Sequence, residues 1–161
     1  MTPYEAIIAK RDLRMYTDQP IPDDVLHRIL QAGRMAGSAK NFESNRLVVV
    51  TDQAVQDALA DAGDFSSWIG SSAMLIGLAT PVGQERPFDV GRQAQNMMLA
   101  ATSLGLASCP IGFARFVTAT KLYPTLKVAG SREVKLALAI GYGDEVPKEH
   151  ERVKDNVFHL A

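Results

Sequence analysis

The stretch Asp89–Gly112, DVGRQAQNMMLAATSLGLASCPIG, predicts a buried helix, a tight stop and a short strand. Apolar residues recur along one helical stripe, at Val90, Ala94, Met97, Met98, Ala101 and Leu104. Leu99 and Ala100 extend the apolar character around most of the helix. Such a helix is packed on several sides, so we expect the rest of the chain to be built around it.

Both ends of this helix carry stop signals. Asp89 can cap its start, and Gly105 stands where a left-handed residue would end it. The chain then continues as a strand-like segment, Leu106–Cys109, into Pro110-Ile111-Gly112. Because the proline donates no backbone hydrogen bond and the glycine has no side chain, a flat ligand could approach the backbone there. The alternative, which these residues on their own favour, is a core helix followed by an ordinary strand end.

Length and composition predict one domain, 1–161, with a real core: the chain has 161 residues, of which 47% are hydrophobic. The formal net charge of -1 gives no electrostatic reason to expect a nucleic-acid or acidic-lipid partner. No apolar run approaches membrane-spanning length, and the N-terminus does not resemble a signal peptide. We therefore expect a cytoplasmic protein with no membrane partner.

The chain has one cysteine, Cys109, and three histidines, His27, His150 and His159. The apolar neighbours of Cys109 favour a buried, inert thiol. The histidines lie far apart in the sequence, so no local metal-ligand spacing exists and we expect no metal.

The first residues, Thr2-Pro3-Tyr4-Glu5, form a capping box with proline at the first helical position. Tyr4, Ile7 and Ile8 would give this helix, which should run to about Lys10, one apolar face. A basic motif follows, Lys10-Arg11-Asp12-Leu13-Arg14-Met15-Tyr16, with three cations in five residues. These cations either complement the carbonyl end of the helix or clamp an anion, because arginine presents a planar fork of donors.

The remaining segments alternate between helices and strands. A second helix should start at Asp23 or Asp24, bury Val25, Leu26, Ile29 and Leu30, and end or loosen at Gly33. The polar loop 35–45 leads to an apolar strand, Arg46–Thr51, expected in the interior of a sheet with both faces covered. Further predicted elements are a helix over Gln53–Ala62 with Val55, Ala58, Leu59 and Ala62 inward, strands over Ala73–Ala79 and Val134–Tyr142, and a short helix over Thr118–Tyr123. This order predicts a layered domain of the α/β or α+β class around a mixed sheet.

The common catalytic motifs GxGxxG, GxxxxGK[ST], GxSxG and HExxH are absent from the sequence. This argues against the usual dinucleotide, P-loop, serine-hydrolase and zinc-protease sites. We name no catalytic side chain.

Four segments together resemble the FMN-dependent nitroreductase family. They are the basic motif 10–16, the loop Ala36-Gly37-Ser38-Ala39-Lys40-Asn41, the stretch Asp89–Gly112 and the strand end Ala139-Ile140-Gly141-Tyr142. They occur in the family's order over almost the whole chain, which resembles a compact member. The resemblance implies an α+β fold of three layers, α/β/α, with a central mixed sheet of four to five strands and FMN at a homodimer interface.

The resemblance also implies a set of FMN-binding residues. Lys10 and Arg11 would lie near the phosphate and Arg14 near the pyrimidine edge of the ring, while Asp12 stands where a serine is usual. Gly37, Ser38 and Ala39 would reach the flavin of the partner subunit, and Asn41 would shape the rim. Pro110, Ile111 and Gly112 would lie against the isoalloxazine, and Arg152 would close over the phosphate.

The implied function is an NAD(P)H oxidoreductase that passes a hydride through flavin N5 to a small-molecule acceptor, such as a nitroaromatic or a quinone, with ping-pong kinetics. Two alternatives stay open. One is a flavin-binding sensor or carrier with little turnover, and the other is a flavin-free interaction domain built on the same dimer.

Overall fold

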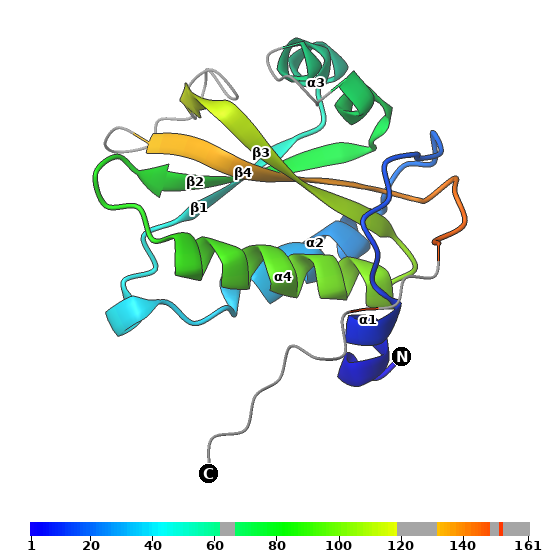
Figure 1. The fold of residues 1–161 in the computed structure, drawn as a ribbon, viewed down its shortest axis with the longest axis horizontal. Coiled ribbons are helices and arrows are strands. Elements are labelled where there is room, and N and C mark those ends of the chain that lie inside the picture. Colours follow the sequence, from blue (N-terminus) through cyan, green and yellow to red (C-terminus); the bar gives the residue numbers. More distant parts are fainter. Residues whose placement is uncertain (62–66, 119–131, 149–151, 153–161) are drawn as a thin grey trace.

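A four-stranded sheet lies between two helical layers in this computed structural model, which describes residues 1–61, 67–118, 132–148 and 152, with the backbone alone for 113–118 (Figure 1). The elements follow the order α1 (Pro3–Ala9), α2 (Asp23–Arg34), η1 (Ala39–Asn41), β1 (Arg46–Val50), α3 (Gln53–Ala60), η2 (Ser67–Ser71), β2 (Met74–Pro81), α4 (Pro87–Ser103), β3 (Ala107–Thr118) and β4 (Arg132–Gly141), where η denotes a 3₁₀ turn. α3 and η2 cover one face of the sheet, and α2 and α4 cover the other (Figure 1). The three-layer α+β prediction is confirmed.

The strand order is β1-β2-β4-β3, and each neighbouring pair is antiparallel. The predicted strand number therefore holds for the described residues, in which the sheet is antiparallel and not mixed. A parallel contact is limited to an isolated bridge between Asp12 and Ser108. The pattern of apolar residues records burial of a strand and contains no information on its direction, so the error is one that sequence periodicity cannot avoid.

β1 was expected in the interior of the sheet, but it forms one edge. Val48 and Val50 are buried against the α3 layer, and Leu47 and Val49 pack, half-buried, on the α2 and α4 layer. Both faces of β1 are thus covered, as predicted. The continuous apolar run of β1 therefore reflects the burial of both its faces and not a central position in the sheet.

α4 is the central helix, as predicted, and Met97 and Ala101 are fully buried in it. Gly105 has a φ of 82°, and the Leu106 N–H donates to the Ala101 carbonyl at 2.9 Å, which is the Schellman end that the glycine indicated. Gly33 lies inside α2, where an added Cβ would stand 2.8 Å from the Met97 side chain. This glycine therefore allows α2 to approach α4 and does not end the helix.

Three helix predictions need correction. Asp89 does not cap α4, whose N-cap residue is Arg86; Asp89 lies in the first turn with its side chain buried. Ala58 is exposed, and Gln56 is buried in its place on α3, which ends at Ala60, while Ala62 lies outside the described residues. The predicted helix 118–123 also lies outside them, apart from Thr118, which belongs to β3.

α1 has the predicted capping box between Thr2 and Glu5, with the Glu5 N–H donating to Thr2 Oγ1 at 3.2 Å. Its apolar face, however, does not enter the core: Tyr4, Ile7 and Ile8 are 72%, 54% and 55% exposed. Nothing among the described parts of this chain covers that face. No helix in those parts is long and apolar enough to cross a bilayer.

Candidate functional site

The basic motif leaves α1 and runs beside the start of β3 and the end of β4 (Figure 1). The Leu13 N–H donates to the Ser108 carbonyl at 3.3 Å, and the Thr17 N–H to the Tyr142 carbonyl at 2.9 Å. The Asp144 N–H donates in turn to the Met15 carbonyl at 3.0 Å. These backbone bonds bring together three of the four segments on which the family resemblance depends, namely the basic motif, the stretch 89–112 and the strand end 139–142. They fix the motif beside Ser108, two residues before Pro110.

The first two cations of the motif have partners within the chain. Lys10 forms an ion pair with Asp12, and its side chain is only 12% exposed. Arg11 donates to the carbonyls of Ile8 and Lys10 at 2.7 and 2.8 Å, which are carbonyls at the end of α1. Of the two roles considered for these cations, Arg11 therefore performs the capping of the helix terminus in this structure.

Arg14 is held differently. Its backbone N–H donates to Glu145 Oε1 at 2.6 Å, and its guanidinium carbon lies 5.5 Å from the centre of the Trp68 ring. The same side chain lies near the Cys109 thiol and lowers its pKa, against the larger effect of burial. Arg14 thus stands beside β3 as a cation held by an aromatic ring.

Tyr16 and Cys109 are buried beneath the contact between the basic motif and β3. The Tyr16 hydroxyl donates to the Leu13 carbonyl at 2.7 Å, and its ring covers Gly141 so closely that a Cβ there would meet it at 2.9 Å. Burial raises the pKa of Tyr16 far above its ordinary value. Burial also raises the pKa of the Cys109 thiol, although Arg14 acts in the opposite direction. Cys109 is therefore the buried, protonated thiol that its neighbours indicated.

Pro110, Ile111 and Gly112 lie on β3, which is the other edge of the sheet. The Ile111 side chain is buried in the core, so only its backbone faces a ligand at the edge. Gly112 is exposed, and a Cβ there would meet no atom within 4 Å. Nearby, the buried Ser108 Oγ has no hydrogen-bond partner. The described residues thus leave open space over Gly112 and one buried hydroxyl without a partner beside it.

The loop with Gly37, Ser38, Ala39 and Asn41 is fixed by a different set of contacts. The Ala39 N–H donates to both Asp89 carboxylate oxygens, at 3.1 and 3.3 Å, and the Glu43 N–H donates to Ser38 Oγ at 3.0 Å. The backbone is left-handed at Lys40, Asn41 and Glu43, with φ of 50°, 54° and 46°. Three such non-glycine residues in four positions are strained, and strain of this kind gathers at functional sites.

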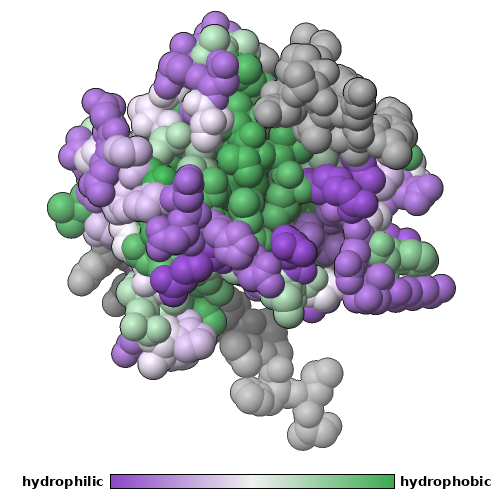
Figure 2. Space-filling model, turned by 180° about the vertical axis from the view of Figure 1, so that it is seen from behind, coloured by the Kyte–Doolittle hydropathy of each residue, from purple (hydrophilic) through white to green (hydrophobic). Residues whose placement is uncertain are grey.

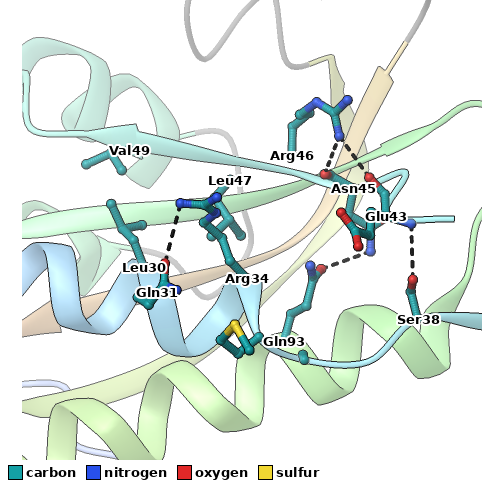
Figure 3. A pocket seen from close by; sticks show the side chains of 12 residues that line it. Leu30, Gln31, Arg34, Ser38, Glu43, Asn45, Arg46, Leu47, Val49 and Gln93 are labelled. Carbon is teal, nitrogen blue, oxygen red and sulfur yellow. Dashed lines mark hydrogen bonds between the residues drawn. The ribbon is translucent and has the colours of Figure 1, made fainter. Parts of the chain in front are cut away.

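A pocket of about 500 Å³ lies between this loop, α2 and β1 (Figure 3). Polar side chains on its rim include Arg34, Glu43, Asn45 and Gln93, and the Asn45 amide donates to Gln93 Oε1 at 2.9 Å. Its apolar wall comes from Leu30, Leu47 and Val49. The pocket is lined by the loop, α2, β1 and Gln93, and no residue of the basic motif lines it.

The sequence-predicted residues therefore form two groups. Lys10, Arg11, Asp12 and Arg14 lie beside the start of β3, just after the C-terminal end of α4, and Pro110, Ile111 and Gly112 follow on β3, which runs back across the sheet (Figure 1). The loop with Gly37, Ser38, Ala39 and Asn41 lies at the N-terminal end of α4. α4 has 17 residues and is therefore about 25 Å long. No side chain of the loop spans that distance within one chain.

Arg152 is exposed and lies between segments that the structure does not describe. Within the described parts of the chain, no group of three His, Cys, Asp or Glu side chains could hold a metal ion.

Sequence reasoning missed Trp68 and Glu145 as site residues. Trp68 is the only tryptophan of the chain, which could have drawn attention to it, but it lies 54 positions from Arg14 in the sequence. Glu145 lies 131 positions from the backbone N–H that it accepts. No local pattern could have connected these residues to the motif.

Comparisons with known proteins show the family and the fold to which this chain is similar. The model of the nitroreductase family matches residues 7–63 and 83–142. A relative from Archaeoglobus fulgidus is 30% identical over 112 residues, which are 66% of this chain and 64% of that protein. The NADPH-flavin oxidoreductase of Vibrio harveyi is 26% identical over 95% of this chain and 70% of its own length.

Among solved structures, a nitroreductase with bound FMN from Bacteroides fragilis superposes with a TM-score of 0.83 at 24% identity, over the whole of both chains. The NADPH:FMN oxidoreductase of Vibrio harveyi, complexed with NAD+, superposes with a TM-score of 0.80 at 25% identity, over 99% of this chain and 79% of that one.

Proposed function

The chain belongs to the nitroreductase family, and from this we propose that it is an FMN-dependent NAD(P)H oxidoreductase that reduces small acceptors such as nitroaromatics or quinones. The observation that carries the proposal is the contact of the basic motif with β3 at Ser108, directly before the open edge at 110–112. The curated relatives are longer than this chain, which spans 64% and 70% of two of them, so the activity of the whole protein is part of this proposal.

The residues at this edge suit FMN in their chemistry. Lys10 and Arg14 bring positive charge to a ligand that carries a phosphate and an electron-rich ring edge. The space over Gly112 admits a flat ring, and an edge strand has backbone groups without ladder partners that can bond to it. We assign the phosphate to Lys10, Arg11 and Arg152, and the pyrimidine edge to Arg14.

Bound FMN would supply the redox chemistry, accepting a hydride at N5 from NAD(P)H and returning it to the acceptor in a ping-pong cycle. The protein's part is electrostatic. A fixed Arg14 cation favours the negative charge that gathers at the pyrimidine edge on reduction, because a preorganised charge costs no reorganisation during the reaction. No protein acid or base is needed in this scheme.

We propose that the working form is a homodimer. The loop at Gly37, Ser38, Ala39 and Asn41 is about 25 Å from the motif of its own chain, so it would complete the flavin site of a partner. The exposed Tyr4, Ile7 and Ile8 of α1 also need cover. Figure 2 shows a further area of apolar side chains in the middle of the face turned away in Figure 1, with polar side chains on its left and below it. Surfaces of this kind mark interaction sites, and folding would be linked to association.

A cytoplasmic location, and the lack of nucleic-acid and membrane partners, stay predictions.

The test is an absorption spectrum of the purified protein, titration with FMN, and anaerobic addition of NADPH or NADH. We expect yellow protein with one FMN per chain that bleaches on reduction, and parallel double-reciprocal lines with a nitroaromatic or quinone. Arg14→Met should weaken FMN binding, whereas Arg28→Met, an exposed position on α2, should leave it unchanged.

Two results would contradict the proposal. Yellow protein that neither nicotinamide bleaches would indicate a flavin sensor or carrier. Colourless protein that does not bind added FMN would indicate a flavin-free interaction domain.

A further inference from the structure

Arg14 is fixed by two residues outside the basic motif, Trp68 in η2 and Glu145 after β4. Neither residue belongs to the set that the family resemblance implied. Their arrangement around Arg14 indicates a role that rests on the proposed flavin function and makes it more specific.

Glu145 acts on the backbone. Its Oε1 accepts the N–H groups of Arg14 at 2.6 Å and of Met15 at 3.3 Å. Within the described residues, no carboxylate lies within 4 Å of the Arg14 guanidinium. Glu145 therefore fixes the direction in which the side chain leaves the backbone without neutralising its charge.

Trp68 acts on the side chain. An indole face attracts a guanidinium through its quadrupole, and it does so without accepting the N–H groups that a carboxylate would accept. Trp68 itself packs against the buried cluster that includes Tyr16 and Ile111, so the ring is held in place. The ring thus restrains the cation and leaves its remaining donors available to a ligand.

We propose that Trp68 and Glu145 are positioning residues that hold Arg14, still charged, beside β3 for the pyrimidine edge of reduced FMN. An arginine fixed in advance loses less side-chain entropy when the flavin binds. The cation also interacts more strongly with the reduced flavin, which gathers negative charge there, than with the oxidised one. Loss of either positioning residue should therefore weaken binding of reduced FMN more than binding of oxidised FMN.

The experiment compares Arg14→Met, Trp68→Leu, Trp68→Phe and Glu145→Gln in the full chain. Asp144→Asn is the matched control, because it makes the same acid-to-amide change at the neighbouring exposed position. Each protein is titrated with FMN, and the midpoint potential of the bound flavin is measured. The potential reports the ratio of the dissociation constants of reduced and oxidised FMN, which a merely structural role would leave unchanged.

We expect R14M to raise this ratio about tenfold, which lowers the midpoint potential by about 30 mV for a two-electron couple. E145Q and W68L should raise it about threefold, and W68F, which keeps an aromatic face, should stay near the unchanged protein. The double variant R14M/W68L should match R14M, because Trp68 acts through Arg14. If W68L does not fold, E145Q and the effect of R14M on Trp68 emission still test the positioning role.

Trp68 also provides a readout that needs no activity. It is the only tryptophan, so the fluorescence of the protein reports on this one ring. Replacing Arg14 with methionine should change the emission of Trp68 before FMN is added, and D144N should not.

The outcomes separate the two claims. An unchanged protein that does not bind FMN overturns the proposed function, and this role with it. If the unchanged protein binds FMN but the ratio is the same in R14M, E145Q and W68L, or if R14M leaves the Trp68 emission unaltered, only the positioning role is overturned.

Discussion

Asp12 is the residue whose chemistry fits the proposed phosphate site least well, and the structure shows how its charge is balanced. It forms an ion pair with Lys10, one of the three cations assigned to the phosphate, and is half-exposed. In Asp12→Ser, Lys10 would be released and a negative charge would leave the site. We expect FMN to bind about three- to tenfold more tightly, which corresponds to roughly 1 kcal/mol and is typical of an exposed pair. Fluorescence titration of FMN measures this.

Asp18→Ser is the control for this prediction, since Asp18 is an exposed aspartate outside the motif. Weaker binding by D12S would show that the aspartate itself supports the ligand, and the assignment of Lys10 to the phosphate would then be wrong.

Tyr16 should make the fold sensitive to alkaline pH. Burial raises its pKa in the folded chain, whereas the unfolded chain ionises near pH 10. Above about pH 10 only the unfolded state loses this proton, so the free energy of unfolding falls by up to about 1.4 kcal/mol per pH unit until the folded pKa is reached. Tyr16→Phe removes this fall, at a cost of about 1 kcal/mol at neutral pH for the lost hydrogen bond to Leu13.

Urea unfolding at pH 8 and pH 11, followed by Trp68 fluorescence, measures both effects. The difference in unfolding free energy between Y16F and the unchanged protein should disappear at the higher pH. Tyr4→Phe, at an exposed tyrosine, should leave the alkaline fall unaltered. A fall of the same slope in Y16F would show that Tyr16 ionises in the folded state.

At the scale of elements, α4 organises its surroundings through Asp89 as well as through its apolar faces. The buried Asp89 carboxylate accepts the Ala39 N–H and thereby ties the strained loop to the first turn of α4. Asp89→Ala would leave this N–H without a partner, at a cost of about 2 kcal/mol of unfolding free energy. Amide hydrogen exchange over 39–43 should accelerate.

Asp52→Ala is a suitable control, because Asp52 also accepts a backbone N–H, that of Val55 at 3.1 Å, but at the start of α3. It should cost about 1 kcal/mol and leave exchange in the loop unchanged. Unchanged exchange over 39–43 in D89A would show that the loop holds its shape without α4.

For the whole molecule, the main prediction concerns the exposed face of α1. If this face packs against a second copy, Ile8→Glu should raise the dimer dissociation constant by at least about a hundredfold, because it places a charge where about 2 kcal/mol of apolar burial is expected. Light scattering after size exclusion should then report 17.5 kDa in place of twice that mass. FMN binding should be lost in parallel, since in the proposed dimer each site takes its loop from the partner.

Val82→Glu introduces the same charge at an exposed apolar residue in the turn before α4 and serves as the control. A monomeric unchanged protein that still binds one FMN per chain would contradict the proposed shared site.

Several signals that act over a few residues were read correctly from the sequence, although those at Asp89 and Gly33 were not. The Thr2 and Glu5 box starts α1, Gly105 ends α4, and the apolar runs mark β1, β2 and β4. Each depends on backbone groups or side chains within about five positions, so composition and spacing are sufficient to identify it. The family resemblance, which rests on four such local segments in order, was confirmed by the family comparison.

Tertiary structure decided which of these pieces meet. The spacing of apolar residues predicts that a residue is buried but not what it packs against. It therefore could not predict that β1 forms an edge, that the apolar face of α1 is exposed, or that Asp89 accepts the Ala39 N–H. The same holds at the site. Arg14 meets Glu145 across 131 positions of sequence because the sheet brings the start of β3 beside the end of β4, and it meets Trp68 across 54 positions. Contacts between such distant segments leave no local pattern in the sequence.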